Sequence, residues 1–139
     1  MKGILFLLFA FPTLVIGQDS KLIPFEDVFI KDSLYFNKQD TTMVSGKVAD
    51  WYSNGQLKAQ IPVKNGLVQG VVKTWFESGL IMDEVTLENS ILEGIYKQWN
   101  WTGELLMEGT YKAGKKIGIW KNWHAGKLRS AETYSDDLK

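Results

Sequence analysis

The sequence predicts an all-β fold, an antiparallel meander of short β-hairpins that follows a signal-peptide segment. Two observations predict it. A 24-residue period with Gly and Trp at fixed offsets begins at Gly46, and each period holds two short runs of alternating character separated by turn signals. The composition agrees, because 13 Gly and six Trp accompany only three Pro. Short strands joined by tight turns have this mixture.

The repeat is visible when the chain is written in rows of 24 residues. Each row begins with Gly and has Trp five residues later, and the first three rows have a second Gly four residues after the Trp. The fourth row has lost one residue before its turn glycine. We expect the rows to be four structural repeats, at residues 46–69, 70–93, 94–117 and 118–134. The row glycines are Gly46, Gly70, Gly94 and Gly118, and the row tryptophans are Trp51, Trp75, Trp99 and Trp123.

Turn residues recur at both ends of the second strand of each row. Asn54-Gly55 and Asn65-Gly66 lie between alternating apolar runs. A two-residue hairpin turn of the primed type needs positive φ at both central residues, which Asn tolerates and Gly prefers. We therefore predict primed turns at both pairs and an antiparallel meander of roughly eight to ten strands. The predicted structural turn residues are Gly55, Gly66, Gly79, Gly103, Gly114 and Gly126.

The two strands of a row differ in their patterns. In the second strand of the first row, alternate residues from Leu57 to Val63 are apolar and the residues between them are mostly polar, so one face is expected to be buried and the other wet. Pro62 lies among the outward residues and cannot donate to the ladder, which predicts a bulge or fraying. In the first strand, Trp51 lies on one side and Val48 on the other, so large apolar side chains are expected on both faces.

The tryptophans are predicted to form a row across the sheet, and two interpretations of that row are open. Large aromatic side chains dominate the energetics of small cores, so the row could be the core of a thin sheet. It could also be a ligand-binding platform, and Trp101 is of interest because it lies outside the regular column and next to a turn. The candidate binding surface consists of Trp51, Trp75, Trp99, Trp101, Trp120 and Trp123.

The N-terminal segment predicts export. Residues 1–17 place Lys2 before an apolar stretch that ends at Gly17, which is the layout of a signal-peptide helix. The stretch is shorter than the roughly 20 residues that span a bilayer, and Pro12 interrupts it, so cleavage after Gly17 is favoured over a retained anchor. The protein is expected to be periplasmic or extracellular. Residues 18–45 are predicted to be a lead-in with a capping half repeat, and residues 135–139 a tail.

The pattern resembles the MORN-variant repeat, of the "membrane occupation and recognition nexus" type, found in the YwqK-like antitoxin-type repeat family. Trp51, Asn54, Gly55 and Leu57 match its W-Y-x-N-G-x-L signature, and the resemblance covers roughly residues 33–134. Later rows depart from it, since Ser78 replaces the Asn of the first turn. The resemblance implies an elongated, single-layer β-sheet of stacked hairpins, and an antitoxin-like, scaffolding or lipid-contact role.

Composition and motifs argue against several functions. The chain has no Cys and one His, His124, so zinc binding and nucleophilic catalysis lack their usual groups. His124 occupies an aromatic column and is interpreted as structural. The acidic residues show no shared column and no pair suited to glycoside hydrolysis. We therefore predict that the protein is not an enzyme and needs no cofactor or metal. These acidic residues are Asp50, Asp83, Glu84, Glu104 and Glu108.

The remaining function is binding. The formal net charge of zero gives no support to nucleic-acid binding, and a protein partner is expected for a repeat module of this kind. A carbohydrate or cell-wall ligand on the aromatic row is the alternative. A lipid surface is a weaker one, because the basic residues near the C-terminus lack a polybasic excess. That basic cluster is Lys112, Lys115, Lys116, Lys121, Lys127 and Arg129.

Overall fold

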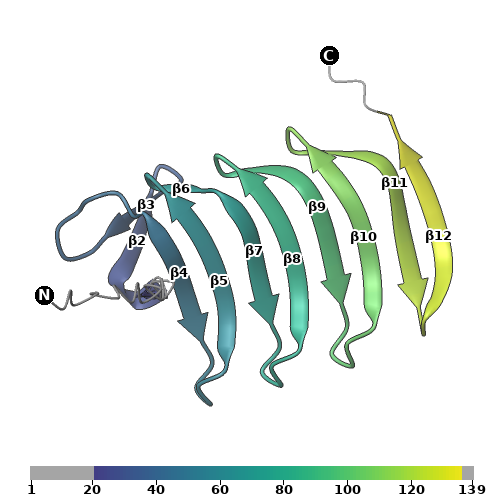
Figure 1. The fold of residues 1–139 in the computed structure, drawn as a ribbon, viewed down its shortest axis with the longest axis horizontal. Helices are drawn as coiled ribbons and strands as arrows, with labels where there is room; N and C mark the ends of the chain where they lie inside the picture. Colours follow the sequence, from purple (N-terminus) through teal and green to yellow (C-terminus); the bar gives the residue numbers. More distant parts are fainter. Residues whose placement is uncertain (1–20, 136–139) are drawn as a thin grey trace, which may run out of the picture.

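The computed structural model describes residues 21–135 and consists almost entirely of β-structure. Successive hairpins lie side by side in one long sheet of ten strands, with a separate two-stranded sheet at its N-terminal end (Figure 1). The predicted all-β class and the elongated antiparallel meander are therefore confirmed. The predicted signal peptide and residues 136–139 of the tail lie outside the described residues.

Every neighbouring pair from β4 to β12 is antiparallel, and sequence order is kept throughout. In sheet order the strands are β1 (Ile23–Pro24), β4 (Gly46–Trp51), β5 (Leu57–Lys64), β7 (Gly70–Trp75), β8 (Ile81–Glu88), β9 (Ile91–Trp99), β10 (Leu105–Lys112), β11 (Lys115–His124) and β12 (Lys127–Tyr134), and β6 (Leu67–Val68) also pairs with β5.

The N-terminal segment covers the first edge of the sheet. After β1, which pairs with β4 in parallel, a short 3-10 turn (η1, Phe25–Asp27) leads into the hairpin of β2 (Val28–Lys31) and β3 (Leu34–Asn37). Backbone hydrogen bonds of 2.9 Å tie this segment to the first repeat, where the Tyr35 N–H donates to the Gly66 carbonyl and the Gly66 N–H donates to the Val44 carbonyl. The edge of β4 is thus capped, as a free edge would pair with other chains.

Beneath this cap lies the most completely buried cluster of the described residues. Four valines, contributed by β2, the β3–β4 connection, β4 and β5, pack together with Ile23, Tyr35 and Ile61 around them. Burial raises the pKa of the Tyr35 hydroxyl. The cluster shows that the cap supplies a second layer only at the N-terminal end. Its valines are Val28, Val44, Val48 and Val63.

The hairpin turns are of two kinds. Asn65 and Gly66 have φ of 49° and 78°, which confirms the predicted primed turn there. At the opposite end of the strands the prediction for Asn54-Gly55 was wrong, because only Gly55 has positive φ (84°) and the Gly55 N–H donates to the Tyr52 carbonyl. This is a three-residue loop with Gly in the left-handed region. The Asn54 side chain instead accepts a hydrogen bond from the Gln56 N–H at 2.9 Å.

The deletion in the fourth row changes the turn type of the last hairpin. The β7–β8 and β9–β10 loops repeat the three-residue arrangement, with positive φ at Gly79 and Gly103. Between β11 and β12, Ala125 and Gly126 both have positive φ, and His124 pairs directly with Lys127. Removal of one residue therefore converts a three-residue loop into a two-residue primed turn without disturbing the strands.

A β-bulge recurs in each long hairpin next to the row tryptophan. In the first hairpin Asp50 pairs with Ala59 and Trp51 with Leu57, so Lys58 is the extra residue. Equivalent register shifts follow Thr74 and Asn122, and another lies between Leu105 and Met107. The bulge places Leu57 on the face of Trp51, whereas strict alternation predicts it on the face of Ala59. Pro62 causes no bulge in β5, which is continuous from Leu57 to Lys64. The interruption lies in the strand that pairs with it, which is divided into β6 and β7.

Gly55→Val is expected to lower the free energy of unfolding by about 1–2 kcal/mol, because a β-branched residue is strained at positive φ. Nothing lies within 4 Å of the position that a β-carbon would occupy there, so the cost reports backbone conformation alone. Urea denaturation followed by circular dichroism measures it. Gly55→Asn is the matched control and should lose much less, since Asn tolerates the left-handed region. Equal losses would contradict the assigned turn.

Candidate functional site

The sheet has two unequal faces, and the row tryptophans lie on one of them. On β7, β9 and β11 the residues two before and four before each tryptophan share its face, because side chains alternate along a strand. We call the side with Trp51, Trp75, Trp99 and Trp123 the tryptophan face. Cross-strand pairing extends it over the intervening strands, so that three parallel rows of side chains cross the sheet.

The first row is aromatic and aliphatic. Each tryptophan is opposite a branched aliphatic residue of the next strand, and Trp51–Leu57 is the first such pair. Trp51 is 39% exposed, whereas Trp75, Trp99 and Trp123 are half-buried. Aromatic–aliphatic cross-strand pairs of this kind stabilise a sheet. The row is therefore neither a closed core nor a fully exposed platform. The other pairs are Trp75–Ile81, Trp99–Leu105 and Trp123–Leu128.

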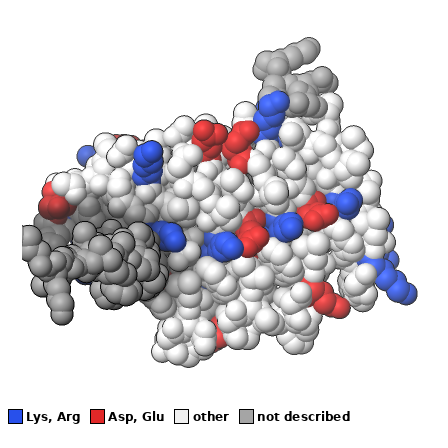
Figure 2. All heavy atoms as spheres, in the orientation of Figure 1, with Lys and Arg blue, Asp and Glu red and all other residues white. Residues whose placement is uncertain are grey.

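The second row alternates in charge and crosses the middle of the sheet. Figure 2 shows it as alternating blue and red side chains. Lys73 pairs with Glu84 and contacts it at 2.8 Å, and Lys121 contacts Glu108 at 3.4 Å. These side chains keep 29–43% of their surface exposed, so each ion pair contributes little to stability. In strand order the row is Lys73, Glu84, Lys97, Glu108 and Lys121.

Lys97 occupies the centre of this charged row. It pairs in register with Glu84 on one side and Glu108 on the other. Among the described residues, no ion pair joins Lys97 to either glutamate, since each glutamate contacts the lysine on its other side. The Lys97 ammonium is therefore available to a partner carboxylate that approaches the face.

The third row is β-branched and well exposed. Ile95 and Ile119 are each 58% exposed and Val71 is 43% exposed. Threonines lie between them on the intervening strands. A shallow hollow of about 350 Å³ lies over β9 to β11 and is bordered by Ile95, Ile119 and the charged side chains beside them. Exposed apolar residues that lie next to one another on an ordered surface are typical of interaction sites. The threonines are Thr86, Thr110 and Thr133.

Two of the predicted binding tryptophans do not lie on this face. Trp101 is 74% exposed at the tip of the β9–β10 turn. Trp120 is only 2% exposed on the opposite face, so its assignment to a binding surface was wrong. Its ring packs against Tyr96, Tyr111 and Tyr134 at centroid distances of 5.7, 4.9 and 6.4 Å. Trp120 is thus part of a second core near the C-terminal edge.

The predicted basic cluster is divided between the two faces. The Lys116 ammonium lies 4.2 Å from the centroid of the Trp120 ring, a cation–π contact on the opposite face. Lys121 belongs to the charged row. These two lysines therefore lie on different faces of the sheet. No helix among the described residues has the length and hydropathy to cross a bilayer.

The residues considered for catalysis are distributed over the sheet, except that Glu84 and Glu108 share the charged row. His124 is exposed at the end of β11. Asp83 accepts hydrogen bonds from the Thr74 hydroxyl at 3.1 Å and the Gln98 amide at 3.1 Å on the opposite face. Glu84 lies on the tryptophan face. Residues 21–135 contain no group of three or more His, Asp or Glu side chains that could hold a metal ion.

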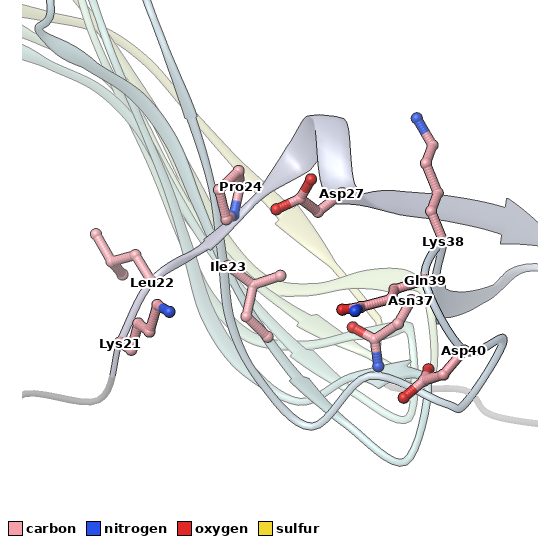
Figure 3. A pocket seen from close by; sticks show the side chains of 9 residues that line it. All are labelled: Lys21, Leu22, Ile23, Pro24, Asp27, Asn37, Lys38, Gln39 and Asp40. Carbon is pink, nitrogen blue, oxygen red and sulfur yellow. The ribbon is translucent and has the colours of Figure 1, made fainter.

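A larger groove of about 660 Å³ lies at the N-terminal cap, between β1 and the β3–β4 connection (Figure 3). Two of its charged side chains form hydrogen bonds within the cap itself. The Lys38 ammonium donates to the Glu26 carbonyl at 2.7 Å, and Asp40 accepts from the Thr42 hydroxyl at 2.7 Å. The hydrogen bonds from Thr42 lower the pKa of the Asp40 carboxyl. The groove is therefore built by the capping segment.

Sequence reasoning missed the charged row, although a signal was present. Lys73, Lys97 and Lys121 are 24 residues apart, and so are Glu84 and Glu108. The expectation that the acidic residues share no column was wrong for this pair. A search for charged columns as well as for Gly and Trp columns would have found it. Their juxtaposition across strands additionally requires the register.

The comparisons with known proteins bear on the first repeat. Residues 45–65 match the family described as MORN repeat variant. The comparisons with curated proteins and with solved structures gave no match. The matched segment contains β4, the three-residue turn and β5, which is the unit that the later rows repeat. The first hairpin of the regular sheet is therefore the part of the chain that matches the MORN repeat variant.

Proposed function

We propose that this protein is an exported, non-catalytic repeat module that binds another protein through its tryptophan face. The observation that carries the proposal is the ordered exposure of apolar side chains beside the charged row. Ile95 and Ile119, each 58% exposed, lie next to Lys97 and Lys121 on one surface. A solvent-facing strand position normally carries a polar residue. The presence of isoleucine at both positions favours a surface that is covered by a partner.

The three rows have the composition of a protein interface. Specific interfaces combine aromatic and aliphatic contacts with polar groups that fix the partner's orientation. Here the aromatic row and the β-branched row flank the charged row, so a partner would meet apolar contacts on either side of its own charges. MORN repeats commonly mediate protein or membrane-lipid interactions, and the division of the lysines between the two faces favours a protein. An antitoxin-like role would be one form of this binding.

Export and the lack of catalysis complete the proposal. The apolar segment of residues 1–17 has the layout of a signal peptide, and the mature chain would begin at Gln18. The chain has no Cys and a single His, which is exposed at the end of β11, so the usual groups of nucleophilic catalysis are lacking. Binding therefore accounts for the observed surface better than turnover does.

Affinity capture with the mature chain tests the binding face. The double variant Ile95→Ser and Ile119→Ser is expected to lose at least ten-fold of the protein captured from the native source by the unsubstituted chain, because two apolar contacts are removed. Ile30→Ser is the matched control, since Ile30 is 51% exposed on β2, outside the long sheet. Mass spectrometry identifies the captured proteins. Peptide mapping of this protein isolated from its native source determines separately whether the mature chain begins at Gln18.

Two results would contradict the proposal. Equal capture by the double variant and by the unsubstituted chain would remove the tryptophan face from binding. Retention on cell-wall polysaccharide that is abolished by Trp101→Ala would instead support the carbohydrate alternative, which the 74% exposure of Trp101 favours. Aromatic rings exposed to that degree can stack on a flat ligand.

A further inference from the structure

We propose that the tryptophan face binds the tryptophan face of a second copy of this chain, about a two-fold axis that runs parallel to the strands between β9 and β10. This inference rests on the proposed function and specifies its partner. It follows from the periodicity of the face. In each row the type of side chain alternates from one strand to the next, so that the same type recurs every second strand.

The charged row is complementary to itself under this axis. A two-fold axis parallel to the strands reverses the order of the strands while keeping each row at its own level. Lys97 of one copy then faces Glu108 of the other, and Glu84 faces Lys121. An isologous contact makes each pair twice. Because the row has alternating signs, lysine faces glutamate at all four positions nearest the axis.

The two other rows are complementary in size. Under the same operation Ile95 faces Thr110 and Ile119 faces Thr86, so a larger side chain meets a smaller one. Trp99 likewise faces Leu105. Complementary packing of this kind is required when two sheets pack face to face about 10 Å apart. The hollow over β9 to β11 lies beside the axis, and the two isoleucines that border it are each 58% exposed.

Other arrangements of two copies lack this match. A two-fold axis perpendicular to the strands would place every lysine of the charged row against the same lysine of the partner. Like charges at short range are unfavourable across an interface. A rotation about an axis centred on a single strand would also pair equal charges. Because the charges alternate from strand to strand, only a two-fold axis that lies between two strands brings opposite charges together.

The area is sufficient for a weak, specific contact. The strands from β7 to β12 span about 24 Å at 4.8 Å per strand, and their paired segments are about 20 Å long. Two copies would cover roughly 1,000 Å² in total, near the lower end for specific interfaces. A contact of this size is typical of weak association.

Complementary charge reversal tests the axis. In sedimentation velocity at 50–100 µM and low salt, the unsubstituted chain is expected to be dimeric. Lys97→Glu alone and Glu108→Lys alone should each be monomeric, because each brings like charges together twice. An equimolar mixture of these two variants should form a heterodimer, since every contact at positions 97 and 108 is again between opposite charges. Lys31→Glu, on β2, is the control and should leave the dimer unchanged.

The outcomes separate this inference from the proposed function. A monomeric unsubstituted chain, or a mixture that stays monomeric while both variants keep the native circular dichroism spectrum, overturns the dimer. An axis between β8 and β9 would also fail in the mixture, because the glutamate introduced at position 97 would then face Glu84 of the other copy. If the chain is monomeric but the Ile95 and Ile119 variant still loses a captured protein of another sequence, the proposed function stands with a different partner.

Discussion

Trp120→Ala is expected to lower the free energy of unfolding by about 3–5 kcal/mol. Trp120 is 2% exposed and is the largest fully buried side chain of the described residues. Its ring contacts three tyrosines, and its indole N–H donates to the Thr110 carbonyl at 3.2 Å. Truncation would leave a cavity in the aromatic cluster that supports this end of a single-layer sheet. Chemical denaturation followed by far-ultraviolet circular dichroism measures the loss.

Trp101→Ala is the matched control for that experiment. The same truncation at a side chain that is 74% exposed removes few contacts, so a change within about 0.5 kcal/mol is expected. A loss below about 1 kcal/mol in Trp120→Ala would mean that the C-terminal hairpins do not depend on this cluster.

Gly109→Ala is expected to cost about 3 kcal/mol, which is the upper end for inserting a methyl group into a packed site. A β-carbon at Gly109 would lie 2.2 Å from the Trp120 ring, far inside contact distance. The indole is held by tyrosines on several sides and cannot move away at low cost. Gly118→Ala is a useful comparison, because nothing lies within 4 Å of that β-carbon and its cost comes from a φ of 63°.

A double-mutant cycle distinguishes a steric cause from a backbone cause. In the Trp120→Ala background the added methyl group occupies part of the vacated space, so Gly109→Ala should cost less than about 1 kcal/mol there. Additive losses would show that Gly109 is required for its backbone conformation and would contradict the steric explanation. Both free energies come from the same denaturation measurements.

Much of the fold could be predicted from the sequence because local patterns determine it. Strand alternation and the positive φ required at Gly66 and Gly126 are set by residues a few positions apart. The repeat then extends one hairpin to the whole sheet, since a unit that cannot bury its own face must pack on the next. Primed turns could be assigned at Asn65-Gly66 because both residues there favour positive φ.

The parts that could not be predicted depend on register. The bulge residue Lys58 has no side-chain type that distinguishes it from a regular strand residue, and its effect is to move Leu57 to the face of Trp51. The Asn54-Gly55 pair suits a two-residue turn as well as a three-residue one, and the loop length depends on where pairing begins. The charged row could not be placed on one face until these shifts were known.

Trp120 illustrates why equal residues need not have equal roles. It lies outside the column of the row tryptophans, at a position where earlier rows have Val72 and Tyr96. Its burial depends on Gly109, which occupies the column of Ile61 and Val85. A large residue in one column is thus accommodated by a small one in another. A composition-based search for exposed aromatics cannot detect this exchange.

The two ends of the long sheet differ from the repeats between them, and this allows the number of repeats to change. β1 and the β2–β3 hairpin close one edge, whereas β12 is the last strand at the other. Duplication or loss of a 24-residue unit between these ends leaves both terminal segments with their original neighbours. Chain length can therefore vary through evolution, or by design, in steps of two strands, and each step adds one more period to the same surface.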